Sequence, residues 1–161
     1  RFGSAMADQG WLIVTGAAIV LAAEISPLLQ AISGLVARLL PHLPTMPLDS
    51  AGLSRAPEVA AEYDRDPLVY HGSVPVRTGA ELVRATKRVR ASMEAIQLPL
   101  LVCHGGADRL SAVEGSRELH RRAGSADKTL RVYDGLYHEL HNEIEREAVL
   151  GHLADWIMAR C

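Results

Sequence analysis

The sequence predicts an α/β fold in which three parallel strands alternate with helices. Three short segments carry the strand prediction, namely Trp11–Val14, Leu98–Cys103 and Thr129–Tyr133. The first two are continuous apolar runs, which are typical of strands covered on both faces. From residue 97 onward, strands and helices alternate with short turns between them, and this order favours right-handed crossovers and a parallel sheet.

Length and composition exclude several classes of protein. A chain of 161 residues suits one domain with a real core. Seventeen basic residues nearly balance nineteen acidic ones, and 48% of the chain is hydrophobic, so neither a disordered tail nor a polybasic nucleic-acid binder is expected. The two cysteines, Cys103 and Cys161, form no disulfide framework and no metal-ligand set. We expect a cytoplasmic location, with peripheral contact at a membrane as the alternative, and we expect neither a cofactor nor a metal.

The N-terminal segment admits two interpretations. Its apolar run, Trp11–Ala23, is shorter than the roughly 20 residues that a membrane-spanning helix needs. It could be the apolar part of a signal peptide, but the residues before it carry one base and one acid. A buried strand, Trp11–Val14, that runs into an apolar loop is the favoured interpretation. Because the first residue is Arg1 rather than Met, we also expect that residues upstream are missing.

The middle of the chain, residues 25–96, is predicted to be rich in helix. Ile25–Leu40 has apolar residues at helical spacing, and Pro57–Tyr63 starts with a proline suited to a first turn. A third helix is predicted over Thr78–Ile96, with Glu81 completing a capping box. Its apolar residues, which we expect to face the core, fall on one side: Leu82, Val89, Met93 and Ile96. Its basic residues are interpreted as a solvated face, since a nucleic-acid surface needs a wider basic area and stacking aromatics. These residues are Arg84, Lys87, Arg88 and Arg90.

Two further helices are predicted in the last part of the chain. Ser111 and Glu114 form a capping box that opens a helix to about Arg122. Asn142 and Glu145 are predicted to cap the final helix. The final helix carries one apolar stripe, made of Val149, Leu150, Leu153, Trp156 and Ile157.

Two polar residues follow the last two predicted strands. Asp108 lies in HGGADRL and His138 in GLYHELHNE, one crossover unit apart, so both loops leave the same edge of the sheet. Ligands of open parallel sheets bind beyond this carboxyl edge. A carboxylate beside an imidazole holds one tautomer and stabilises the imidazolium that forms when the histidine takes a proton from a nucleophile. Asp108 and His138 are therefore the candidate catalytic residues.

These segments resemble a known family. IQLPLLVCHGGADRL, SADKTLRVYDGLYHELHNE and the final helix resemble the C-terminal part of monoacylglycerol lipases, which are lysophospholipase-like serine α/β-hydrolases. APEVAAEYDRDPLVYHG is similar to the cap region of that family, and the resemblance extends from about Gly10 to the end. It implies that the chain is the C-terminal part of an α/β-hydrolase, with core segments 1–24 and 97–161 and a helical cap over residues 25–96. It also implies that Asp108 is the triad acid and His138 the general base.

The sequence departs from this family at the nucleophile. The family's serine sits in a G-x-S-x-G turn after a strand, and no serine here has glycine both two before and two after it. Ser54 has only Gly52 in place, and Ser4 has neither glycine. The oxyanion-hole loop is missing as well, and RFGSAMADQG resembles the end of the helix after the nucleophile turn. We expect the back half of a serine hydrolase that is inactive alone.

The resemblance implies a carboxylic ester hydrolase for monoacylglycerols or lysophospholipids, which would release a fatty acid by a Ser–His–Asp mechanism. The apolar helix at 25–40 suits a lid that meets acyl chains or a membrane surface, and equally suits plain packing on the sheet. The open edge of the first strand predicts self-association. Two alternatives remain: a non-catalytic lipid-binding or self-associating module, and an α/β-hydrolase for a peptide, thioester or haloalkane.

Four single residues have competing interpretations. In HELH, His138 and His141 are three residues apart rather than the four of a zincin helix. His141 is therefore expected to lie behind the site residues or at the surface, rather than on a metal. His104 is expected to be a hydrogen-bonded core histidine and Cys103 a small buried hydrophobe. Asp66 could order the cap through backbone hydrogen bonds or lie in a solvated turn.

Overall fold

The computed structural model describes residues 12–15, 34–45 and 47–161. Residues 34–39 are helical. The other elements, in chain order, are β1 (Leu12–Thr15), η2 (Ser50–Gly52), α3 (Pro57–Arg65), α4 (Val76–Ala91), η3 (Met93–Ala95), β2 (Leu100–Gly105), α5 (Val113–Arg122), β3 (Lys128–Tyr133), η4 (Leu140–Asn142) and α6 (Arg146–Met158). The predicted α/β class is confirmed. Trp11 of the first predicted strand, most of the predicted core segment 1–24 and residues 25–33 of the predicted helix Ile25–Leu40 lie outside the described residues.

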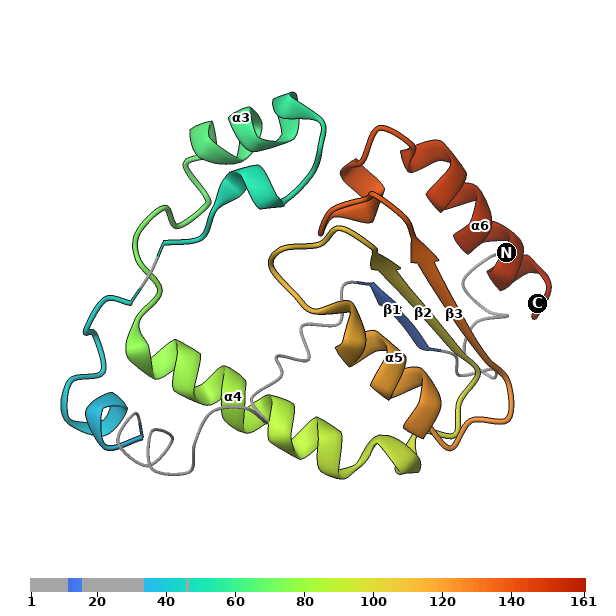
Figure 1. The fold of residues 1–161 in the computed structure, drawn as a ribbon, viewed down its shortest axis with the longest axis horizontal. Coiled ribbons are helices and arrows are strands. Elements are labelled where there is room, and N and C mark those ends of the chain that lie inside the picture. Colours follow the sequence, from blue (N-terminus) through green and yellow to red (C-terminus); the bar gives the residue numbers. More distant parts are fainter. Residues whose placement is uncertain (1–11, 16–33, 46) are drawn as a thin grey trace.

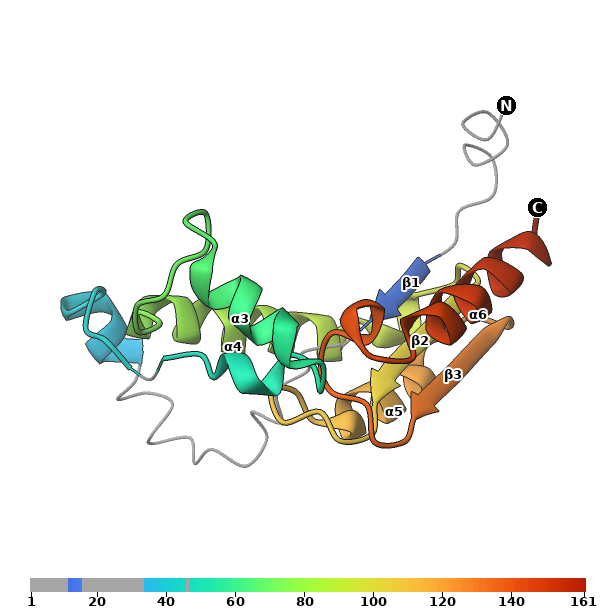
Figure 2. The same cartoon turned by 90° about the horizontal axis from the view of Figure 1, so that it is seen from above.

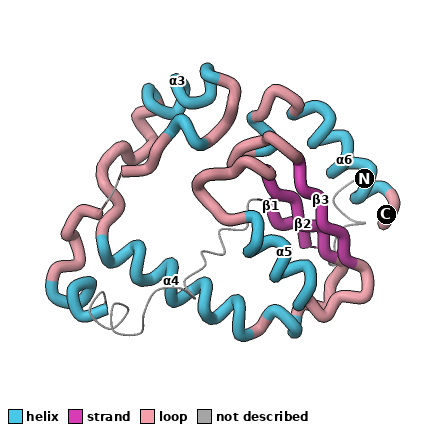
Figure 3. Tube along the Cα trace, in the orientation of Figure 1, coloured by secondary structure: helices cyan, strands magenta, loops and turns pink. Residues whose placement is uncertain are grey.

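The described sheet has three parallel strands in the order β1-β2-β3 (Figure 3). Leu100 of β2 is level with Leu12 of β1 and with Lys128 of β3. Strand β2 starts two residues later than predicted because Pro99 has no N–H to donate to a ladder. All six residues of β2 are buried, as its apolar sequence predicts.

Helices cover both faces of the sheet, α5 on one side and α6 on the other (Figures 1 and 2). Because side chains alternate along a strand, β2 contributes to two separate cores. Leu100 and Val102 pack with Met93, Leu119 and Ala123.

The opposite face of β2 presents Leu101 and Cys103 to α6, where Val149 and Trp156 are buried. Leu150 is exposed, so the predicted stripe on this helix lacks one of its five members.

Between β1 and β2 the chain makes a long excursion, called the insertion below (described residues 34–45 and 47–96). Helix α3 and turn η2 lie beyond the carboxyl ends of β2 and β3, and α4 returns the chain to the start of β2 (Figure 1). Proline at the first turn of α3 is confirmed. Helix α4 is shorter than predicted and is followed by η3. Its Leu82 and Val89 are exposed.

The capping box predicted for α4 is wrong. The helix starts at Val76, two residues before Thr78, and no side chain caps it. The Glu81 carboxylate instead accepts hydrogen bonds of 2.7 Å from Arg77 and Arg84, which lie one turn away on the same helix. Of the four basic residues predicted to form a solvated face, Arg84, Lys87 and Arg88 are exposed, but Arg90 is half-buried and pairs with Glu118 of α5.

The two later capping predictions are also wrong. Helix α5 starts at Val113 and helix α6 at Arg146, neither with a side-chain cap. The hydroxyl of Ser111 donates to Asp108, and the amide of Asn142, in turn η4, donates to Glu139. In both cases the side chain that was predicted to cap the helix donates its hydrogen bond to a nearby carboxylate instead.

Candidate active site

The carboxyl ends of β2 and β3 bring the two predicted site residues together. Gly105 and Tyr133 are level at the ends of these strands, so the loops that follow them are neighbours. Asp108 lies in the first loop and His138 in the second. Nδ1 of His138 is 2.8 Å from Oδ2 of Asp108, so the carboxylate and the imidazole are hydrogen-bonded.

The Asp108 carboxylate is buried, with its side chain 1% exposed. Its Oδ1 accepts the backbone N–H groups of Leu110 (2.7 Å) and Ser111 (3.0 Å), and Oδ2 accepts the Ser111 hydroxyl (2.7 Å). Burial acts to raise the pKa of Asp108, but the hydrogen bonds from Ser111, His138 and Leu110 outweigh it and hold that pKa below its usual value. Asp108 is thus an anion near neutral pH.

This charge fixes the state of the imidazole. Because an ionised carboxylate can only accept, Nδ1 of His138 carries a proton, and in the neutral ring the lone pair is therefore on Nε2. No described residue hydrogen-bonds Nε2, and the side chain is 27% exposed. The ring therefore presents a basic nitrogen away from Asp108, where a hydroxyl group could approach it.

A second histidine contacts the same carboxylate. His104 is fully buried at the end of β2, with Nδ1 2.7 Å from the Ser116 hydroxyl. Its Nε2 lies 3.2 Å from the Ser111 carbonyl and 3.3 Å from Oδ2 of Asp108. The prediction of a hydrogen-bonded core histidine is confirmed.

The structure adds Glu143, which the sequence analysis did not single out. Its side chain is fully buried, and Oε1 accepts the N–H of Tyr137 (2.6 Å) and of Arg55 (3.3 Å). Oε2 accepts Nε of Arg55 at 3.1 Å, and the guanidinium also contacts Glu145. One available signal was the position of this glutamate in the same polar loop as His138; its partner Arg55 lies 88 residues earlier and could not be found from spacing.

Ser54, the serine closest to the G-x-S-x-G pattern, has a structural role. It is buried, its hydroxyl donates to the carbonyl of Asn142 (2.9 Å), and the oxygen accepts the N–H of Ala56 (3.0 Å). A hydroxyl engaged on both sides and aimed at backbone is not placed to attack a substrate. Ser4 lies outside the described residues.

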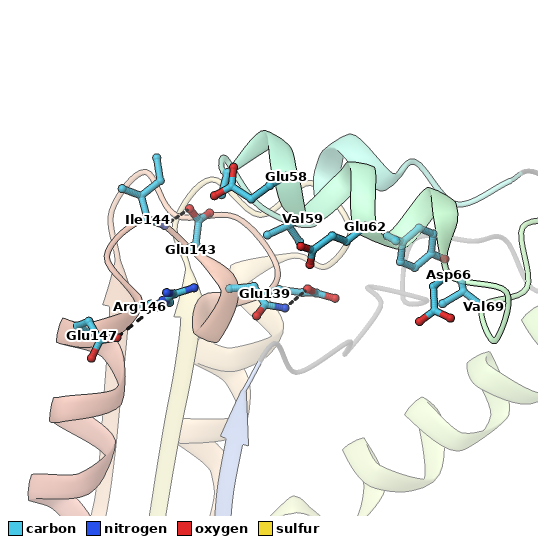
Figure 4. Close-up of a pocket in the computed structure, with 13 residues that line it drawn as sticks. Glu58, Val59, Glu62, Asp66, Val69, Glu139, Glu143, Ile144, Arg146 and Glu147 are labelled. Carbon is cyan, nitrogen blue, oxygen red and sulfur yellow. Dashed lines mark hydrogen bonds and ion pairs between the residues drawn. The ribbon is translucent and has the colours of Figure 1, made fainter.

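A cavity of about 610 Å³ lies between α3 and the loop that leads to α6 (Figure 4). Carboxylates dominate its lining, and neither Asp108 nor His138 belongs to it. Side chains of α3 face the His138 loop across this space (Figure 4). The acidic members of the lining are Glu58, Glu62, Asp66, Glu139, Glu143 and Glu147.

The remaining single residues mostly lie as predicted. Cys103 is buried, and burial raises the pKa of its thiol, so it packs as a small hydrophobe. His141 is exposed. Asp66 combines both of its interpretations: it is exposed, and its carboxylate accepts the N–H of Leu68 at 2.8 Å. Within the described ranges, no cluster of three or more candidate ligands could hold a metal ion, and no helix is both long and apolar enough to cross a membrane.

The parallel sheet and the polar pair at its carboxyl edge match a known class of enzyme, the α/β-hydrolases. The crystal structure of Paleococcus ferrophilus monoacylglycerol lipase superposes with a TM-score of 0.79 at 26% identity, over 92% of this chain and 58% of that one. The chain belongs to the hydrolase family described as serine aminopeptidase, S33, whose model matches residues 5–145.

Within this class, the resemblance to monoacylglycerol lipases is confirmed. A monoacylglycerol lipase of Mycolicibacterium smegmatis is 39% identical over 148 residues, which are 92% of this chain and 53% of the relative. A monoglyceride lipase of Rattus norvegicus is 37% identical over 75% of this chain and 41% of its own length. The chain thus spans about half the length of the curated relatives that it matches.

Proposed function

We propose that this chain is the part of a serine ester hydrolase that carries the acid and the base, and that its substrates are monoacylglycerols. The observation that carries the proposal is the 2.8 Å hydrogen bond between His138 and Asp108, with Nε2 of the imidazole left for a nucleophile. The relatives named monoacylglycerol lipase and monoglyceride lipase support this substrate class over a peptide, thioester or haloalkane.

In the proposed mechanism the nucleophilic serine comes from a segment that precedes Arg1. Nε2 of His138 takes the proton of that serine as its oxygen attacks the ester carbonyl, and Asp108 stabilises the imidazolium. The imidazolium then protonates the departing glycerol oxygen, which leaves an acyl-enzyme. A water molecule, activated in the same way by His138, cleaves the acyl-enzyme and releases the fatty acid.

Two features support a further part of the fold. In the described sheet β1 pairs only with β2, which leaves the other edge of β1 without a strand. Helix α4 also exposes Leu82 and Val89, which the spacing predicts to be buried. A segment that pairs with β1 and covers this helix would account for both.

The insertion is proposed to be the cap of this enzyme. Its described N-terminal part exposes several large apolar side chains, which suit contact with acyl chains or with the surface of a lipid aggregate. These are Leu35, Leu39, Leu40, Leu43 and Leu48.

The first test is the coding sequence upstream of Arg1, where a strand ending in G-x-S-x-G is expected. The protein with this sequence restored, called the full-length protein below, should hydrolyse a monoacylglycerol and react at one serine with a fluorophosphonate probe. His138→Ala and Asp108→Asn should each lower kcat by about 10⁴-fold. The matched controls, His141→Ala and Asp134→Asn, change exposed residues near the same loop and should leave kcat unchanged.

Three outcomes would contradict the proposal: an upstream sequence without the serine turn, full activity in the two site variants, or probe labelling of a serine within residues 1–161. The non-catalytic alternative predicts something different. It expects that residues 1–161 by themselves bind lipid vesicles through the cap or self-associate through β1, which vesicle sedimentation and analytical ultracentrifugation would detect, and that the full-length protein lacks turnover.

A further inference from the structure

The loop that carries His138 is fastened at the residue on each side of the imidazole. On one side the N–H of Tyr137 donates to Oε1 of Glu143 at 2.6 Å. On the other side the N–H of Glu139 donates to the carbonyl of Leu53 at 2.8 Å. The first bond comes from the loop itself, and the second comes from the insertion. The backbone position of His138 is therefore set by groups that are not part of the Asp108–His138 pair.

Glu143 links the first of these two attachments to the insertion as well. A fully buried carboxylate is tolerated only when its oxygens are satisfied by donors and its charge by a cation. Arg55 supplies both, because its backbone N–H and its Nε donate to the two oxygens of Glu143. Arg55 is separated by only one residue from Leu53, whose carbonyl holds Glu139. Residues 53–55 of the insertion therefore bind the His138 loop at two points, Glu139 and Glu143.

This stretch also touches the loop of the acid. A Cβ placed on Gly52 would lie 3.2 Å from Leu110 Cδ2, so the backbone of turn η2 packs directly on the residue whose N–H binds Asp108. Ser54 adds a third tie to the His138 loop through the carbonyl of Asn142. Residues 52–55 therefore bridge the two loops that meet in the candidate active site.

We propose that Arg55 and Glu143 are positioning residues for His138, which lock the base loop to the insertion and so make the placement of the imidazole depend on the placement of the cap. This inference rests on the proposed function, in which His138 is the general base. Because proton transfer requires the imidazole within hydrogen-bond reach of the nucleophile, a displacement of about 1 Å would lower turnover by about 100-fold. Substrate binding, which involves other surfaces of the cap, would change little.

The test compares kcat and KM in variants of the full-length protein. Glu143→Ala should lower kcat by about 100-fold at nearly unchanged KM. Glu143→Gln keeps an amide oxygen for the N–H of Tyr137 but turns its NH2 group toward the Nε–H donor of Arg55, so it should recover only part of the lost kcat. Arg55→Lys keeps the charge without the fork geometry of the guanidinium and should give an intermediate loss.

The matched control is Glu118→Ala. Glu118 is also largely buried and paired with two arginines, Arg90 and Arg122, but it lies on α5 away from both loops. Its loss should lower the melting temperature and leave kcat intact below that temperature. If Glu143→Ala does not fold, Arg55→Lys provides the test, together with faster amide hydrogen exchange in a peptide that covers residues 136–142.

The outcomes separate the two proposals. Full activity in His138→Ala would overturn the proposed function, whatever the Glu143 variants do. If His138→Ala is inactive, and folded Glu143→Ala and Arg55→Lys keep the wild-type kcat or lose no more than Glu118→Ala does, the positioning role is wrong. A loss of kcat in Glu143→Ala that Glu143→Gln does not relieve would also contradict it.

Discussion

The hydroxyl of Ser111 donates to the oxygen of Asp108 that also accepts the imidazole of His138. The Ser111 hydroxyl is 2.7 Å from Asp108 Oδ2 and 3.4 Å from Nδ1 of His138. Backbone N–H groups of Leu110 and Ser111 hold the other oxygen. The Asp108 carboxylate is thus oriented by residues of its own loop, independently of His138.

Ser111→Ala should destabilise the full-length protein and slow its turnover. The variant removes a hydrogen bond to a charged group, which contributes about 2 kcal/mol, and leaves Asp108 less firmly oriented. Urea unfolding would measure the first effect, and kcat the second, with an expected loss of about tenfold. The control is Ser125→Ala, which removes a buried hydroxyl bonded to the carbonyl of Asp127. It should cost about 1 kcal/mol and leave kcat unchanged. Equal kcat values for the two variants would contradict this role of Ser111.

Asp108 should contribute stability that disappears in acid. Its hydrogen bonds hold its folded pKa below the unfolded value of about 3.9. The contribution is therefore fully present above that value and is lost as the pH falls through the folded pKa. The measurement is the free energy of unfolding of the full-length protein and of Asp108→Asn between neutral pH and about pH 2. The difference should be constant near neutrality and should narrow below about pH 4. A difference that widens on acidification would refute the depressed pKa.

Gly105→Ala should disrupt the candidate site. A Cβ at Gly105 would overlap the carbonyl oxygens of Leu136 and Tyr137, which belong to the backbone of the His138 loop. Since backbone cannot swing aside as a side chain can, the variant should lose about 1–3 kcal/mol or more and most of its activity. Gly79→Ala and Gly151→Ala are the controls, because a Cβ on either helical glycine meets nothing within 4 Å. They should gain up to about 1 kcal/mol. A fully active Gly105→Ala variant would show that the two loops can separate without loss.

The exposed leucines at the start of the insertion should matter only for aggregated substrate. Leu39→Ser and Leu43→Ser should each weaken binding to phosphatidylcholine vesicles by about tenfold, because each removes an apolar side chain from the contact. Hydrolysis of a soluble short-chain ester should not change. Leu68→Ser is the control, since Leu68 is 92% exposed but lies outside this group. If all three variants bind vesicles alike, these leucines do not form a lipid contact.

The sequence predicted the sheet and the polar pair well because both depend on local patterns. Buried strands are visible as apolar runs, and the residues after parallel strands must share an edge, so Asp108 and His138 could be paired from their positions alone. Helix starts were predicted less well. The S-x-x-E pattern at Ser111 is a valid capping signal. In the folded chain, however, the Ser111 hydroxyl donates to the carboxylate of Asp108 instead of capping the helix.

Long-range contacts account for the rest. The pair of Arg55 and Glu143 joins residues 88 positions apart, and nothing in either segment indicates the other. The apolar face predicted for α4 is a different case. Its periodicity predicts burial for Leu82 and Val89, yet both are exposed in the described structure. Periodicity shows which face of a helix seeks a partner but does not say where that partner comes from.

The separation of Arg55 and Glu143 along the chain has a consequence for how the protein acquires its activity. Contacts between distant segments form late because the intervening chain must first be ordered. The strand–helix units at the C-terminal end can assemble from segments that are neighbours in sequence. The His138 loop, in contrast, gains its bonds to Leu53 and Arg55 only when the insertion has packed against it. During refolding of the full-length protein, the far-UV circular dichroism signal should therefore recover before the rate of ester hydrolysis does.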